Sequence, residues 1–179
     1  MMRAIDVANF FIIVGSMNKG AETTNTRINM LLYFSQGWHL AKTGKPLFNE
    51  KIEAWDYGPV VHNVYSTFKP YDKNLITVTS ENFDLDSMRD EDFEFLSDIF
   101  MNYSDYSTRT LINLTHKKGS PWDTVYVGGK NVIIPQNLMQ NYFRTLPKLY
   151  NVDDDIKNLP TVGYINDEGY TVLPKEEDE

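Results

Sequence analysis

The sequence predicts a compact single domain that is mainly α-helical, with about six to eight helices and a small antiparallel β-sheet, an α+β fold. Three observations lead to this prediction. Between residues 5 and 146, apolar residues recur at helical spacing in several stretches, and two short stretches alternate as strands do. Gly, Pro, Ser and Thr stand where these helices would begin and end. The chain of 179 residues is 41% hydrophobic, which is enough to fill the core of one domain.

Charge is distributed unevenly along the chain. Residues 1–150 carry 16 acidic and 15 basic side chains, whereas residues 151–179 carry 9 acidic and 2 basic side chains. We therefore divide the chain into a nearly neutral helical domain, residues 1–150, and an acidic C-terminal extension, residues 151–179. Within the extension, residues 161–173 resemble a β-hairpin, and the tail at residues 175–179 is expected to be disordered.

The composition also excludes several classes of protein. The chain contains no cysteine, so a disulfide framework, a thiol nucleophile and a thiolate metal site are ruled out. No basic patch is visible, which disfavours direct nucleic-acid binding. No stretch approaches the roughly 20 apolar residues of a membrane span, and residues 7–14 lack the flanks of a signal peptide. The sequence therefore predicts a soluble cytoplasmic protein without a membrane partner.

Two helices are expected in the first part of the chain. Apolar residues at i, i+3 and i+7 predict a helix over residues 5–14, followed by a polar, Gly-containing loop. The strongest helical pattern begins around residues 24–26, any of which can cap a helix, and its apolar stripe continues to residue 41. Gly44 and Pro46 then predict the end of this helix, which should cross the middle of the core.

The next segment contains the two predicted strands. Residues 48–55 alternate between apolar and charged residues, which predicts a short half-buried strand. Gly58 predicts a break, and Pro59 is expected in the first turn of the next helix, which stops before Pro70. A weaker alternation predicts a second strand over residues 75–79.

Further helices are expected in the second half of the chain. Their predicted ranges are residues 90–101, 107–116, 120–126 and 135–146. The first has an acidic first turn and an apolar stripe formed by Phe93, Leu96 and Phe100. Ser107 and Ser120 are expected to cap the second and third.

The search for chemistry finds three histidines, His39, His62 and His116. His39 has no carboxylate at the spacing of a helical metal-ligand pair, so we interpret it as a packing residue. His62 is interpreted as a surface residue and His116 as a cap at the end of a helix. The serines show no nucleophile elbow and the glycines no phosphate-binding loop. The sequence therefore indicates a protein that is not an enzyme, with no catalytic residue, metal ligand or cofactor.

Four ordered motifs connect the chain to a known family. They lie at residues 31–48 (beginning LLYFSQGWHLA), 52–61 (IEAWDYGPVV), 114–122 (LTH and SPW) and 134–143 (beginning IP and ending YF). In their order and spacing across residues 4–145, these motifs resemble the Panacea domain of the SocA-like, phage-associated antitoxin family.

The resemblance implies a helical domain with a small sheet and the role of antitoxin in a two-gene toxin–antitoxin system, often carried by a prophage. Members neutralise a cognate protein toxin by direct binding, and one relative, SocA, is a proteolytic adaptor that delivers its toxin to the ClpXP protease. The implied partners are a cognate toxin and, in the adaptor mode, a ClpXP-type protease. Two alternatives stay open: a phage-encoded regulator or protease adaptor without a toxin partner, and an unrecognised enzyme that uses His39 and His116.

The motif residues are the candidate site, and each belongs either to the scaffold or to a partner-binding surface. They are Trp38, His39, Trp55, Tyr57, Gly58, Pro59, Thr115, His116, Ser120, Pro121 and Trp122. A buried aromatic side chain would fill the core, whereas an exposed one would anchor a partner protein. The sequence leaves both interpretations open.

Overall fold

The computed structural model describes residues 1–18, 23–80, 83–147, 164–165 and 171–172. In these residues seven α-helices and a three-stranded antiparallel sheet form a compact, mainly α-helical fold, which confirms the predicted fold class. The helices are α1 (Ala4–Met17), α2 (Asn25–Thr43), α3 (His62–Phe68), α4 (Asp90–Tyr103), α5 (Thr108–Thr115), α6 (Pro121–Val125) and α7 (Gln136–Thr145), with two 3₁₀ turns, η1 (Lys69–Tyr71) and η2 (Leu85–Ser87). Within the described part of the chain, no helix combines the length and apolar character needed to cross a membrane.

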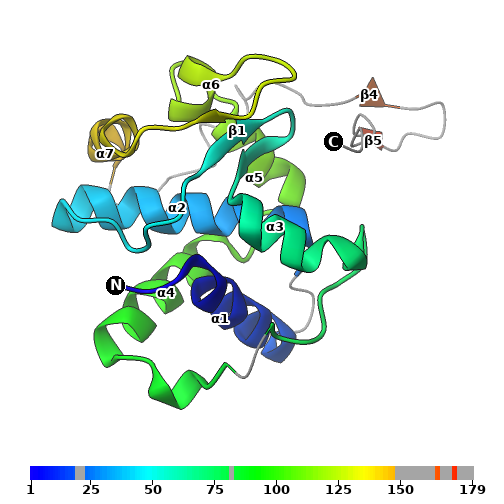
Figure 1. The fold of residues 1–179 in the computed structure, drawn as a ribbon, viewed down its shortest axis with the longest axis vertical. Helices are drawn as coiled ribbons and strands as arrows, with labels where there is room; N and C mark the ends of the chain where they lie inside the picture. Colours follow the sequence, from blue (N-terminus) through cyan, green and yellow to red (C-terminus); the bar gives the residue numbers. More distant parts are fainter. Residues whose placement is uncertain (19–22, 81–82, 148–163, 166–170, 173–179) are drawn as a thin grey trace.

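Helix α2 forms the centre of the molecule, as predicted. In Figure 1 it crosses the middle of the view, with α1 and α4 on one side and β1, α5 and α6 on the other. Its ends also match the prediction, because Thr24 Oγ1 accepts the N–H of Arg27 at 3.3 Å and Gly44 terminates the helix with a φ of 73°. Residues 27–37 are all buried, so the predicted single stripe covers only part of the buried surface. A helix buried on all sides lies inside the core rather than over it.

The three-stranded sheet has the order β2-β1-β3. Its strands are β1 (Glu53–Trp55), β2 (Gly58–Val60) and β3 (Val132–Ile133). The strand predicted over residues 48–55 is limited to β1, and the prediction that Pro59 lies in a helical turn was wrong. Gly58 adopts a φ of 126°, which reverses the chain so that Pro59 pairs with Ala54 in an antiparallel hairpin. Proline lacks a donor N–H, and it is tolerated here because β2 is an edge strand.

Residues 75–79 do not form the predicted strand. Ile76 is bonded to Thr23 through its N–H (2.9 Å) and its C=O (3.2 Å), and the Asn9 amide bonds both backbone groups of Ser80 (2.7 and 2.9 Å). The segment is therefore held at its ends by individual residues and pairs with no strand among the described residues. Ile76 is buried whereas Val78 is 63% exposed, so only one of the two apolar residues on which the strand prediction depended packs into the core.

Helix α4 lies close to the predicted range, but its predicted apolar stripe is too long. Leu96 and Phe100 are buried, while Phe93 is 40% exposed. Phe93 lies near the N-terminus of the helix and meets the core through an edge-to-face contact with Phe10, with ring centroids 5.7 Å apart. The stripe that packs into the core therefore begins one turn later than expected.

Three strands complete the described fold. Strand β3 was not predicted, because two residues carry no readable alternation and this strand exists through its pairing with Glu53 and Ala54. Strands β4 (Tyr164–Ile165) and β5 (Thr171–Val172) pair in antiparallel fashion inside the segment where a hairpin was expected. The residues between them and the predicted disordered tail lie outside the described residues, and the division of the chain at residue 150 stays a prediction.

Buried amide side chains on α2 hold the segments that surround it. Gln36 is 1% exposed, its Nε2–H donates to the Phe48 carbonyl at 2.8 Å, and its Oε1 accepts the N–H of Leu47 at 2.8 Å. Asn29 Oδ1 accepts the N–H of Val61, just after β2, at 2.9 Å. Buried backbone groups outside helices and ladders need such partners, so these amides fix the path of the chain on both sides of the hairpin.

A first prediction concerns Gly37, where α7 packs closely on α2. A Cβ atom at Gly37 would lie 2.3–2.5 Å from ring atoms of Phe143, a side chain that is 1% exposed. Although alanine is the better helix former, we expect Gly37→Ala to lower the free energy of unfolding by about 1–3 kcal/mol, because the buried ring has little room to move. Thermal and denaturant unfolding measure this loss.

Gly128→Ala is the matched control for that substitution. A Cβ atom there would meet the Tyr126 hydroxyl at an ordinary 3.6 Å. We expect a change below about 0.5 kcal/mol for this variant. If Gly37→Ala were as stable as the control, the close approach of the two helices would be wrong.

A second prediction concerns the Gln36 amide. Gln36→Leu preserves most of the side-chain volume but leaves the N–H groups of Leu47 and Phe48 and the Phe48 carbonyl buried without their partner. We expect the free energy of unfolding to fall by about 2 kcal/mol or more. In the control Gln140→Leu, a half-buried amide loses a single bond to the Leu40 carbonyl, and the expected loss is about 1 kcal/mol. Equal losses in the two variants would contradict the special role of Gln36.

Candidate functional site

The candidate residues lie in two parts of the structure. Trp38 and His39 are half-buried in the C-terminal half of α2. The indole N–H of Trp38 donates to the Tyr103 hydroxyl at 2.9 Å, and His39 Nδ1 lies 2.7 Å from the Lys45 carbonyl oxygen. Burial raises the pKa of the Tyr103 hydroxyl, so this group remains a neutral partner for the indole. These contacts tie α2 to α4 and to its own terminating turn, which is a scaffold role.

The other candidate residues surround the β1–β2 hairpin. Gly58 is buried, and a Cβ atom there would lie 3.0 Å from Met30 Cε and 3.2 Å from Thr115 Oγ1. Pro59 is buried beside it in β2, and Tyr57 is half-buried in the turn. Together with the φ of 126°, which side chains other than glycine rarely adopt, these close approaches favour glycine at position 58.

Helices α5 and α6 hold the hairpin from its other side. The Ser120 hydroxyl donates to the Thr115 carbonyl at 2.6 Å and accepts the N–H of Asp123 at 3.1 Å, which starts α6 as predicted. Pro121 follows in the first turn, and the indole N–H of Trp122 donates to the Trp55 carbonyl at 2.8 Å. Thr115, Ser120, Pro121 and Trp122 are all buried, and Trp122 is bonded directly to the backbone of the hairpin.

His116 occupies the junction between the hairpin and these helices. Its Nδ1 lies 2.8 Å from the Ile112 carbonyl oxygen, which confirms the predicted role as a cap of α5, and its Nε2 lies 3.3 Å from the Asp56 carbonyl oxygen. The ring packs against Trp122, with centroids 3.7 Å apart. Burial is the largest influence on this imidazole and lowers its pKa, so folding favours the neutral form of His116.

The exposed side of the hairpin carries a second aromatic group, which we call the Trp55 face. It consists of Trp55, Glu53, His62 and Tyr65. The indole N–H of Trp55 donates to Glu53 Oε2 at 2.8 Å. The centroid of the Trp55 ring lies 4.9 Å from that of the Tyr65 ring and 5.7 Å from that of the His62 ring. His62 is exposed, as predicted, and Trp55 and Tyr65 are half-buried. The two tryptophans around the hairpin therefore differ, since Trp122 is 6% exposed and internal.

Sequence reasoning missed several members of this region. Glu53, Tyr65 and Asp56 were not singled out, although the Asp56 carboxylate accepts a hydrogen bond from the Tyr126 hydroxyl at 2.8 Å. The position of Tyr126 could have been predicted from helical spacing, because it follows Trp122 by four residues. Their rings stack with centroids 4.2 Å apart. The contact of Trp55 with α3 had no such signal, because it depends on how the hairpin folds back.

The two histidines named for the enzyme alternative have different surroundings. His39 contacts Thr43, Lys45 and the ring of Phe95, whereas His116 contacts the α5 terminus, Asp56 and Trp122. In each case a ring nitrogen faces a backbone carbonyl. In the residues that the structure describes, no three His, Asp or Glu side chains are grouped in a way that could hold a metal ion.

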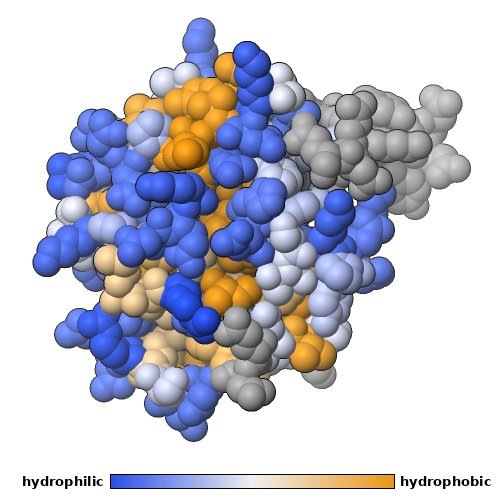
Figure 2. Space-filling view, viewed as in Figure 1, coloured by the Kyte–Doolittle hydropathy of each residue, from blue (hydrophilic) through white to orange (hydrophobic). Residues whose placement is uncertain are grey.

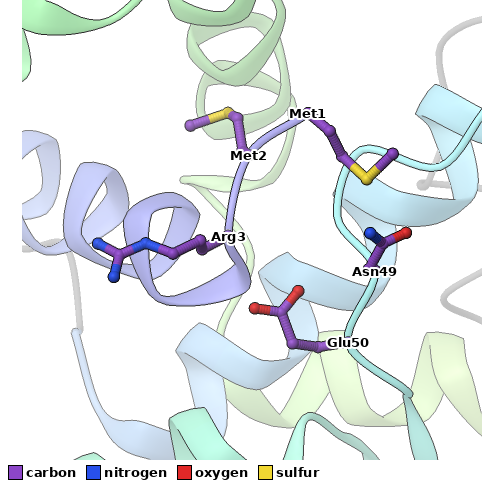
Figure 3. A pocket seen from close by; sticks show the side chains of 5 residues that line it. All are labelled: Met1, Met2, Arg3, Asn49 and Glu50. Atoms are coloured by element: carbon purple, nitrogen blue, oxygen red, sulfur yellow. The ribbon is translucent and has the colours of Figure 1, made fainter.

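A shallow depression near the N-terminus is the pocket shown in Figure 3. It has a volume of about 460 Å³ and is lined by Met1, Met2, Arg3, Asn49 and Glu50. Glu50 Oε1 accepts the N–H of Ala4 at 2.9 Å, and the Arg3 guanidinium is paired with Asp6. Figure 3 shows the Arg3 side chain pointing away from Glu50, so the charged groups do not converge on a ligand.

The fold and the hairpin region define the class of this protein as an α-helical domain, centred on one buried helix, with a β-hairpin flanked by aromatic side chains. The chain belongs to the SocA-like Panacea family, since the family model described as "Antitoxin SocA-like, Panacea domain" matches residues 28–123, more than half of its length. This match is shorter than the expected residues 4–145, but it includes every candidate residue.

A curated relative supports the same assignment. Antitoxin SocA from Caulobacter vibrioides (strain NA1000 / CB15N) is 31% identical over 114 residues, which are 59% of this chain and 61% of the relative. The aligned region thus spans about three fifths of the relative's length. No solved structure matches the chain.

A third prediction follows from the half-buried imidazole of His116. Its pKa is lowered in the folded chain, whereas the unfolded chain has the ordinary histidine pKa of about 6.5. Around that pH the unfolded chain binds more protons than the folded chain does, so the free energy of unfolding should fall between pH 7.5 and 5.5. The contribution is fully present above the unfolded pKa and is lost as the pH decreases.

Urea unfolding at a series of pH values measures this dependence. In His116→Asn, which cannot titrate, we expect a flatter profile over the same range. Parallel profiles for the wild type and His116→Asn would contradict the prediction.

Proposed function

We propose that this protein is an antitoxin that neutralises a cognate protein toxin by direct binding. The observation that carries the proposal is the family match over residues 28–123, which contains both the scaffold residues and Trp55. The relative named Antitoxin SocA gives the match its functional direction. Family membership by itself names no partner. The proposal adds that this protein binds a toxin, because the partner of an antitoxin is its toxin.

The geometry is compatible with an inhibitor that works by binding. Such a protein needs a rigid frame and an adhesive surface, because order that exists before binding reduces the entropic cost of association. Supports buried beneath the hairpin, such as Trp122 and Ser120, provide the frame. The half-buried Trp55 on the outer side provides an aromatic group of the kind that dominates binding energy in many interfaces.

A fourth prediction tests the proposal in cells. A toxin expressed alone from the gene adjacent to this one should arrest growth, and co-expression of this protein should restore it. The purified pair should co-elute as one complex in size-exclusion chromatography. A harmless neighbouring gene product, or rescue without a complex, would contradict neutralisation by direct binding.

The same experiment separates inhibition from proteolytic delivery. If the protein acts as an adaptor for a ClpXP-type protease, the toxin should disappear from rescued cells and reappear, with renewed arrest, in cells that lack ClpX. If it blocks the toxin directly, toxin levels and rescue should not depend on ClpX. A protein that recruits ClpX without any toxin would instead be a protease adaptor or regulator without a toxin partner.

The enzyme alternative has its own test. It requires turnover by the purified protein that is lost on replacing His39 or His116. The neighbours of the two rings favour binding over catalysis, because each ring nitrogen that bonds a backbone carbonyl is committed to the fold. A histidine-dependent reaction would therefore overturn the proposed function.

A further inference from the structure

We propose that the Trp55 face binds an arginine side chain of a partner protein. The inference rests on the proposed function and deepens it, because it assigns the surface that the partner contacts and the chemistry that it must bring. Three properties of the face support this inference. The Trp55 ring is partly exposed but held by several contacts, a carboxylate lies at the edge of its indole, and the hairpin around it is acidic.

Trp55 is held in place but not enclosed. Its indole N–H is bonded to Glu53, its ring contacts Tyr65 and His62, and its carbonyl is bonded by Trp122. The ring remains half-buried at a strand end on the surface, in contrast to the internal Trp122. A large ring that is already ordered loses little entropy on binding, which is the property of an interface anchor.

The second property is a carboxylate at the edge of the indole. Glu53 Oε2 accepts the indole N–H at 2.8 Å, and the Glu53 side chain is 22% exposed, so it can accept further hydrogen bonds. A guanidinium group can stack on an indole while it donates to a neighbouring carboxylate, because it is planar and carries several N–H donors. A lysine ammonium can approach as a charge but cannot stack, so the geometry favours arginine.

The surrounding surface has the complementary charge. The hairpin (residues 53–60) contains the acidic residues Glu53 and Asp56 and no Lys or Arg, and α3 (residues 62–68) contains no Lys, Arg, Asp or Glu. The nearest titratable neighbour of the Glu53 carboxylate in this face is His62, whose Nδ1 lies 4.0 Å away. A basic side chain of a partner would therefore meet an acidic and aromatic surface.

A peptide titration tests the chemistry without a toxin. The probes are acetyl-Gly-Arg-Gly-amide and acetyl-Gly-Lys-Gly-amide at millimolar concentrations, added to the full chain at low salt. The indole N–H signals of Trp38, Trp55 and Trp122 are followed by NMR and assigned with Trp→Phe variants. We expect a saturable shift of the Trp55 signal with the arginine peptide. No shift, equal shifts of all three signals, or an equal response to the lysine peptide would overturn the proposal.

Two variants complete the test. Glu53→Gln keeps the shape of the side chain and should weaken arginine-peptide binding about tenfold, which corresponds to about 1.4 kcal/mol. Glu94→Gln, the same change at an exposed position on α4, should leave binding unchanged. Trp55→Leu should abolish the response, with the melting temperature showing that the variant is folded. Equal effects of the two glutamine substitutions would overturn the proposal.

The same variants connect the face to toxin neutralisation. In co-expression, Trp55→Leu and Glu53→Gln should lose rescue in parallel with peptide binding, whereas Glu94→Gln should retain it. Full rescue by both folded variants would overturn the assignment of this face. A wild-type protein that never rescues would instead contradict the proposed function, while the peptide titration would still decide the chemistry of the face.

Discussion

The structure depends on polar side chains buried around its central helix. A chain with so little sheet leaves many backbone N–H and C=O groups without a ladder, and burying them unpaired would be costly. Gln36 and Asn29 on α2 and Asn9 on α1 supply the missing partners to residues 47–48, Val61 and Ser80. Each amide both donates and accepts, so one side chain can replace a short piece of strand.

The path of the hairpin follows from this arrangement. Gln36 fixes the chain before β1 and Asn29 fixes it after β2, so the two strands between them have little freedom to shift. Between these two points the close approach of Gly58 to Met30 and Thr115 sets how deeply the hairpin lies against α2 and α5. The outward position of Trp55 is a consequence, because alternation along β1 buries Ala54 and turns its neighbour towards the surface.

Local signals made much of the fold predictable, and tertiary contacts account for the rest. Thr24, Ser107 and Ser120 cap helices as their sequence contexts indicate, because capping involves residues a few positions apart. Pro59 was predicted wrongly because proline after a break is also typical of the first turn of a helix, although its strand partner Ala54 lies only five residues away. Residues 75–79 alternate as a strand does, but they have no partner strand among the described residues. Buried amides such as Gln36 were missed for a related reason: a polar residue in a helical pattern is normally assigned to the surface.

The candidate site shows the same limit, since the motifs marked tryptophans without separating their roles. Trp122 is 6% exposed and its indole N–H donates to the Trp55 carbonyl, whereas the Trp55 ring is half-buried. The buried ring therefore holds the backbone from which the half-buried ring projects. A substitution of a residue beneath the hairpin, such as Trp122, would therefore shift the backbone of the Trp55 face. It would alter this face without replacing any of the residues that form it.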